Sequence, residues 1–149
     1  MQFDYPATVK FLCTKCGICC GDTKEKTRHV LLLKTEVEQI SKATLQPTTQ
    51  FAVKIKDAEP YSYEMKKRAE DGKCIFLKNN LCTIYSIRPL ICKFYPFKLT
   101  WHSEKYNFHF TEECIGIGKG RILREDFFKK LLSLALTRHR EVKDPSKKR

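Results

Sequence analysis

The sequence has no long run of apolar residues. Nothing in it approaches the roughly 20 apolar residues that a transmembrane helix requires, so we expect no association with a membrane. The segment from Met1 to Leu12 contains Asp4 and Pro6 and lacks the apolar stretch of a secretory signal. We therefore expect a cytoplasmic protein, in a compartment where thiols stay reduced.

Internal repeats and linkers rich in glycine, serine or proline are also missing. A chain of 149 residues without such a linker is expected to form one domain with its own core. We predict that this metal-binding domain covers residues 1–142. Residues 143–149 are too polar to pack and are predicted to form a basic, disordered tail.

The sequence lacks a recognisable set of catalytic side chains. The four histidines are scattered, and none has a ligand-like partner at a fixed spacing: His29, His102, His109 and His139. There is no Ser/His/Asp set, and no histidine is evidently placed to activate a cysteine nucleophile. We therefore assign no catalytic residue.

Cysteine, in contrast, is abundant and clustered. Four cysteines lie within the stretch Cys-Thr-Lys-Cys-Gly-Ile-Cys-Cys, and four more lie singly downstream. Gaps of two residues allow successive sulfurs to converge on one point, as thiolate ligation of zinc or iron requires. The candidate metal ligands are Cys13, Cys16, Cys19, Cys20, Cys74, Cys82, Cys92 and Cys114.

The cysteine spacing leaves the metal and the number of centres open. Three cysteines at two-residue gaps match the start of a bacterial ferredoxin run, which needs a remote fourth ligand such as Cys92 or Cys114. This favours an iron–sulfur cluster, of the 4Fe-4S type, slightly over zinc, which more often takes two close and two distant cysteines. Eight thiols suffice for two four-ligand centres, or for one centre and several further thiols. Because the adjacent side chains of Cys19 and Cys20 point apart in most backbone conformations, we expect them to have different roles.

Disulfides are the alternative use of these cysteines. Four disulfides are disfavoured by a reducing compartment, and adjacent Cys19 and Cys20 do not easily pair within a tight loop. Metal ligation is the interpretation that explains the clustering.

The chain carries an excess of positive charge. The formal net charge is +12, which makes a nucleic-acid partner an alternative function. Each four-thiolate centre carries roughly two negative charges, so two centres would remove about a third of this excess. Gly116, Gly118 and Gly120 are either a phosphate cradle or, as we favour, a turn that lets Cys114 approach a metal.

Apolar periodicity and breaker residues predict an α+β domain with β-hairpins. A two-residue turn at Asn79-Asn80 would pair Leu77 with Cys82 and place Cys74 on the opposite face of the hairpin, whereas a three-residue loop would pair Phe76 with Cys82. The predicted strands cover residues 30–33, 51–55 and 61–68, and the predicted hairpins cover residues 74–85 and 97–110.

Three helices complete the prediction. The first begins at Thr35, with Glu38 completing a capping box, and has Val37, Ile40 and Leu45 on its inner face. A short helix opened near Pro89 carries Cys92 inward, and a long C-terminal helix covers residues 121–140.

The order of the cysteines and their neighbours resembles a known family. The matching elements are Cys13-x2-Cys16-x2-Cys19-Cys20, Gly72-Lys73-Cys74, Leu81-Cys82-x2-Tyr85-x2-Arg88-Pro89-x2-Cys92-x2-Tyr95-Pro96 and Cys114-x-Gly-x-Gly. Together they resemble the CxxCxxCC family of zinc- or iron-chelating domains, also called YkgJ-type cysteine-cluster proteins. All eight positions where that family places cysteine are filled. The resemblance implies metal binding, with a protein partner as a possibility.

Some members of that family resemble the cysteine-rich part of flagellin lysine N-methylases. This likeness implies an iron–sulfur cluster and, as an alternative function, a redox or methyl-transfer enzyme component. We see no additional domain of the kind that a complete methyltransferase needs, so we expect no binding of S-adenosylmethionine.

Overall fold

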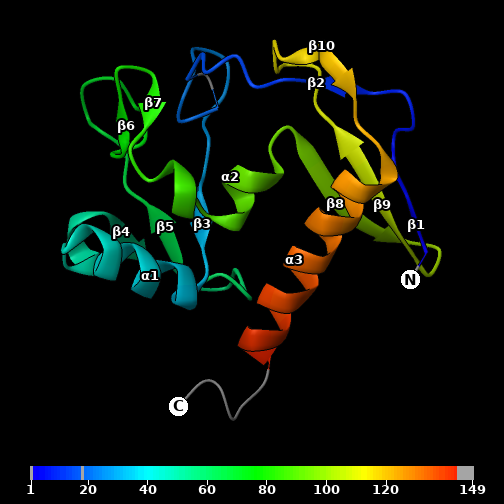
Figure 1. Cartoon of the computed structure of the whole chain (residues 1–149). Helices are drawn as coiled ribbons and strands as arrows, with labels where there is room; N and C mark the ends of the chain where they lie inside the picture. Colours follow the sequence, from blue (N-terminus) through cyan, green and yellow to red (C-terminus); the bar gives the residue numbers. More distant parts are fainter. Residues whose placement is uncertain (1, 18, 144–149) are drawn as a thin grey trace. The chain divides into compact units, whose positions relative to one another are not determined.

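The computed structural model describes residues 2–17 and 19–143 and confirms an α+β fold (Figure 1). The chain divides into two compact units. Unit 1 comprises Met1–Thr14 and Phe94–Thr137, and unit 2 comprises Lys15–Lys93 and Arg138–Arg149. The division falls inside the cysteine-rich stretch, between Thr14 and Lys15. The tail predicted over residues 143–149 lies outside the described residues, except for Lys143.

Unit 2 is built around a small antiparallel sheet and one helix. Its elements are β3 (Leu31–Leu32), α1 (Lys34–Thr44), the 3-10 turn η1 (Thr48–Gln50), β4 (Ala52–Lys54), β5 (Tyr63–Met65), β6 (Leu77–Lys78), β7 (Leu81–Cys82), the 3-10 turn η2 (Tyr85–Ile87) and the start of α2 (Leu90–Phe94). The sheet has the order β3-β5-β4, and β6 pairs with β7 as a separate hairpin.

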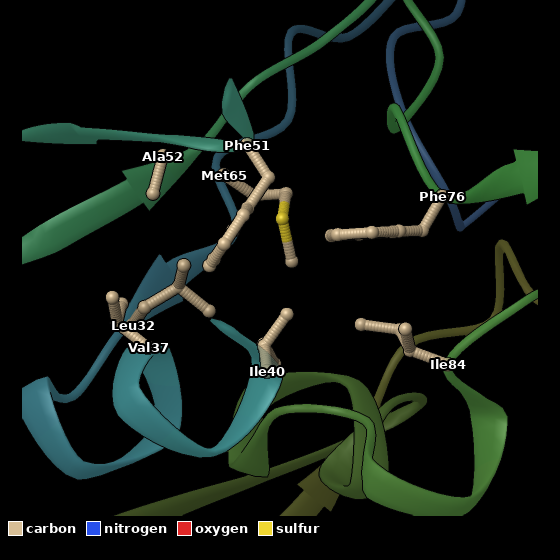
Figure 2. Close-up of a cluster of buried hydrophobic side chains, with 8 residues drawn as sticks. All are labelled: Leu32, Val37, Ile40, Phe51, Ala52, Met65, Phe76 and Ile84. Carbon is tan, nitrogen blue, oxygen red and sulfur yellow. The ribbon is translucent and has the colours of Figure 1, made fainter. Parts of the chain in front are cut away.

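The core of unit 2 collects side chains from each of these parts. In Figure 2, Val37 and Ile40 of α1 point toward Phe51 and Met65, while Phe76 and Ile84 enter from the opposite side. The cluster consists of Leu32, Val37, Ile40, Phe51, Ala52, Met65, Phe76 and Ile84. Two cysteines, Cys74 and Cys82, are partly buried against it, so thiols lie at the edge of an apolar core.

Helix α1 differs from its prediction at both ends. It begins at Lys34 with Leu33 as the N-cap residue, and the carboxylate that accepts the Leu33 N–H is Glu36, at 2.9 Å, rather than Glu38. Val37 and Ile40 are buried as predicted, but Leu45 is 91% exposed. Leu45 forms the left-handed C-cap, with φ of 57°, so its side chain leaves the inner face of the helix.

Strand β4 also presents a different face from the predicted one. Phe51 and Ala52 are buried, whereas Val53 is 52% exposed. Phe51 closes the preceding 3-10 turn, so strand alternation begins only at Ala52. The alternation predicted from Phe51 put Val53 on the inner face and Ala52 on the outer one. It is wrong at these two positions, because the strand begins one residue later than predicted.

Unit 1 contains a three-stranded sheet, a two-stranded ladder and most of a long helix. The sheet joins β1 (Phe3–Asp4), β9 (Lys105–Phe110) and β8 (Phe97–His102) in the order β1-β9-β8, and β2 (Lys10–Phe11) pairs with β10 (Ile117–Ile122). The β8–β9 hairpin is confirmed, with Ser103 and Glu104 both at positive φ in its turn. The ring centroid of Phe128, on α3 (Glu125–Lys143), lies 5.1 Å from the ring centroids of both Phe97 and Phe108.

The predicted start of the C-terminal helix at Arg121 is wrong. Residues 117–122 form β10, and α3 begins at Glu125. Ile122 and Leu123, which we expected on the apolar face of this helix, therefore precede it. Phe128 is the fully buried aromatic residue of its first turn. Among the described residues, no helix has the length and apolar character needed to cross a membrane.

Candidate metal centre

Six of the eight predicted ligands belong to unit 2. All six are partly buried: Cys16, Cys19, Cys20, Cys74, Cys82 and Cys92. They come from the loop after Lys15, the segment before β6, the strand β7 and the helix α2. Four separate parts of the chain thus contribute thiols to one unit.

The cysteine loop is joined to the segment carrying Cys74 by an antiparallel bridge. Gly21 pairs with Lys73, and the Cys74 N–H donates to the Cys20 carbonyl at 2.6 Å. A Cβ added to Gly21 would lie 2.5 Å from the Gly72 carbonyl oxygen and from Lys73 Cα. Only glycine permits this approach, so Gly21 brings the backbones at Cys20 and Cys74 together.

Asp22 reinforces this junction just after the bridge. Its carboxylate accepts the Lys67 ammonium and the Arg28 N–H, both at 2.8 Å, and its carbonyl accepts the Lys73 ammonium at 3.0 Å. The Lys67 hydrogen bond is the largest cause of a lowered pKa at Asp22, followed by the Arg28 N–H. The loop is therefore tied at its C-terminal end by charge-assisted contacts.

The loop also lies against the β6–β7 hairpin. A Cβ on buried Gly17 would lie 3.1 Å from the Asn80 side-chain oxygen and 3.5 Å from a Leu77 methyl carbon. Asn80 is in the hairpin turn, and Leu77 pairs with Cys82. This contact places the cysteine loop beside the hairpin that supplies Cys82.

The hairpin has the two-residue turn, but its consequence for the thiols differs from the prediction. Asn79 and Asn80 both have positive φ, as a tight hairpin turn requires. Cys74 is nevertheless partly buried against the same core as Cys82. The strand begins only at Leu77, whose N–H donates to the Cys74 carbonyl across a turn, so strand alternation does not extend back to Cys74.

Cys92 is carried by α2, as predicted. The helix follows buried Pro89, and its Leu90 N–H donates to a Glu36 carboxylate oxygen at 2.6 Å. Glu36 was not predicted as a residue of the site. The signal was present as an acid three residues after Leu33, but we assigned that position to Glu38 by starting the helix at Thr35.

The thiols of unit 2 influence one another electrostatically. Burial raises the pKa of Cys74, Cys82 and Cys92, and neighbouring thiols add to the effect at each. A hydrogen bond between the Cys19 and Cys20 thiols raises the pKa of Cys19 and lowers that of Cys20. The two adjacent thiols therefore differ in their tendency to ionise.

These properties suit a cation. Neighbouring buried thiols resist ionisation because each thiolate would be desolvated and would repel the others. A bound zinc or iron ion removes both penalties, since it supplies positive charge and takes the thiolates as ligands. Arg88 gives partial compensation at Cys82, where its positive charge offsets some of the effect of burial.

The thiols are nevertheless not fully converged. Within residues 2–17 and 19–143, no three Cys, His, Asp or Glu side chains surround one point closely enough to hold a metal ion. The two observations agree, because charges act over longer distances than metal–ligand bonds. Ligation therefore requires further approach of side chains that already occupy one region.

Cys13 and Cys114 belong to unit 1, at one end of the β2–β10 ladder. The Leu12 N–H donates to the Gly116 carbonyl at 3.1 Å, next to both cysteines in sequence. A Cβ on Gly116 would collide with the Leu12 carbonyl, so this glycine permits close strand packing. A turn follows Cys114 as predicted, with the Ile117 N–H donating to the Cys114 carbonyl at 3.1 Å, but Gly118 and Gly120 lie in the strand β10 and not in that turn.

Fold and site together define a cysteine-rich α+β protein in which unit 2 holds six thiols, two of them at the edge of its core. The chain belongs to the CxxCxxCC family, whose description is "Putative zinc- or iron-chelating domain" and whose model matches residues 12–115. This match includes all eight cysteines.

One curated relative comes from Methanocaldococcus jannaschii and bears the name "Uncharacterized protein MJ0661". It is 28% identical over 142 residues, which cover 87% of this chain and 71% of the relative. No solved structure matches the chain significantly.

Proposed function

We propose that this protein holds a cysteine-ligated metal centre in unit 2, and that the centre stabilises this unit. The observation that carries the proposal is that unit 2 collects six partly buried thiols from four parts of the chain. Two of them, Cys74 and Cys82, pack against its apolar core. Packing alone does not explain this, because a plain core would use residues that are not open to oxidation. Metal binding accounts for the residue type, the clustering and the family.

The ligands are drawn from the cysteine loop together with Cys74, Cys82 and Cys92. Cys74 and Cys82 are held at the core edge, Cys92 is fixed by α2, and Cys20 is tied to Cys74 through the Gly21 bridge. We leave Cys13 and Cys114 of unit 1 out of this proposed centre. They supply only two thiols to unit 1, too few for a four-thiolate site within that unit.

The spacing of the loop cysteines favours an iron–sulfur cluster over zinc. Gaps of two residues are the ferredoxin pattern, and either metal is compatible with the soft thiolate donors of unit 2. A metal bound here would join the loop, the hairpin and α2. We infer that its role is at least structural.

Anaerobic purification followed by analysis of iron, zinc and acid-labile sulfide tests this proposal. Iron and sulfide in equal amounts, with brown charge-transfer absorption, support the cluster, whereas zinc without sulfide supports the alternative metal. We expect Cys92→Ser to lose most of the metal and Cys114→Ser, in unit 1, to retain it. If the wild-type protein takes up no metal after anaerobic reconstitution, either with iron and sulfide or with zinc, the proposal is contradicted.

A further inference from the structure

Glu36 is a buried carboxylate next to the proposed centre that is not itself needed as a ligand. Among the side chains that the structure describes, it is the one charged side chain that is buried, at 4% exposure. Burial of a carboxylate is unfavourable unless hydrogen bonds replace its water. We therefore expect the carboxylate of Glu36 to make specific hydrogen bonds and not merely to fill space.

The two oxygens of Glu36 hold two different segments. Oε1 accepts the Leu33 N–H at 2.9 Å, at the start of α1, and Oε2 accepts the Leu90 N–H at 2.6 Å, at the start of α2. Glu36 and Leu90 are 54 positions apart along the chain. Leu90 lies two residues before Cys92 in a helix of only five residues, so an anchor at Leu90 fixes the position of the thiol.

We propose that Glu36 is a positioning residue for the metal centre, holding α2 against α1 so that Cys92 is presented to the metal. This inference rests on the proposed function. A buried anion beside a thiolate centre is unfavourable electrostatically, which argues that its geometric role outweighs this repulsion.

Replacement of Glu36 by glutamine tests the inference. The amide keeps the size of the side chain, but its NH2 group faces one of the two backbone N–H donors, so only one of the two anchors survives. Glu38→Gln is the matched control, because Glu38 is exposed on the same helix and loses the same charge. Binding of Co²⁺ is followed through its thiolate charge-transfer absorption, and the dissociation constant comes from competition with a chelator.

We expect Glu36→Gln to weaken Co²⁺ binding by about 10- to 100-fold, the usual effect of losing a residue that orients a ligand. We also expect its charge-transfer spectrum to change, while Glu38→Gln keeps the wild-type affinity and spectrum. A variant with lower thermal stability but unchanged affinity and spectrum would overturn the inference, because Glu36 would then have a structural role only. If Glu36→Gln does not fold, the same measurements are made on Glu36→Asp, which keeps the charge but is too short to reach both donors. We expect the same loss of Co²⁺ affinity and change of spectrum, and an unchanged affinity and spectrum would overturn the inference.

The result separates this inference from the proposed function. If the wild-type protein binds neither Co²⁺ nor iron with sulfide nor zinc, the metal centre itself is refuted. If the wild-type protein and the Glu36→Gln variant bind metal with the same affinity and spectrum, only the role of Glu36 is refuted.

Discussion

At the scale of single residues, the geometry around the thiols depends on a position without a side chain. Gly21 has a φ of 147° and lies in the bridge between the cysteine loop and Lys73. A methyl group there would meet backbone atoms, which do not move aside as a flexible side chain does. The approach of Cys20 to Cys74 therefore depends on the absence of a Cβ.

Replacement of Gly21 by alanine is expected to open the bridge. Gly118→Ala is the matched control, because Gly118 also has positive φ, at 89°, but a Cβ there meets nothing within 4 Å. The control should lose only the backbone strain of about 1–2 kcal/mol, whereas Gly21→Ala should lose more stability and most of its metal. Urea unfolding with metal analysis measures both, and equal losses in the two variants would contradict the role of Gly21.

At the candidate site, the helix that carries Cys92 was predictable from the sequence, but the carboxylate that anchors this helix was not. The set of eight ligands stays a prediction, whereas the sequence correctly placed Cys92 on a helix after Pro89. It did not reveal Glu36, because the start of α1 lacks a capping side chain: the N-cap is Leu33, and the acid at the third helical position acts alone. The helix-start pattern from Thr35 to Glu38 was a stronger signal in the sequence.

At the scale of elements, turns with strong local chemistry were predictable. Asn79-Asn80 adopts the positive φ values of a tight hairpin, and the β8–β9 hairpin agrees with its alternating aromatics. The segment from Ile117 to Ile122 was mistaken for a turn and a helix start. Its glycines hide the alternation of a strand, and its pairing with β2 depends on a distant part of the chain.

The C-cap of α1 offers a stabilising substitution. Leu45 is 91% exposed and adopts a left-handed conformation, which glycine accepts without strain. We expect Leu45→Gly to raise the free energy of unfolding by about 0.5–1 kcal/mol, because relief of about 1–2 kcal/mol of left-handed strain exceeds the entropic cost of glycine. Leu45→Ala is the control that keeps the strain, and thermal unfolding should show no gain for it. A gain of the same size in both variants would attribute the effect to lost surface hydrophobicity instead.

At the scale of the whole molecule, the chain separates into a thiol-rich unit and an aromatic one. Unit 2 holds six cysteines, while unit 1 is packed through Phe97, Phe108 and Phe128 and holds two. The sequence predicted one domain and could not show this distribution. It depends on the pairing of β2 with β10, which assigns Cys13 and Cys114 to unit 1.

Removal of the metal should therefore affect the two units unequally. Binding of structural zinc contributes on the order of 10 kcal/mol to folding in small metal domains, so its loss should loosen the loop and hairpin of unit 2. Hydrogen exchange after anaerobic chelation should show lost protection from β3 to β7 and retained protection in β8 and β9. Protection unchanged throughout unit 2 would show that the metal does not stabilise it.

X-ray absorption at the edge of the bound metal, on protein purified without oxygen, tests the central claim most directly because it identifies the ligand atoms. The account predicts a shell of sulfur at about 2.3 Å, with iron neighbours in addition if the centre is a cluster. This shell should lose sulfur in Cys92→Ser and keep it in Cys114→Ser. A shell made of nitrogen and oxygen alone would contradict a cysteine-ligated centre.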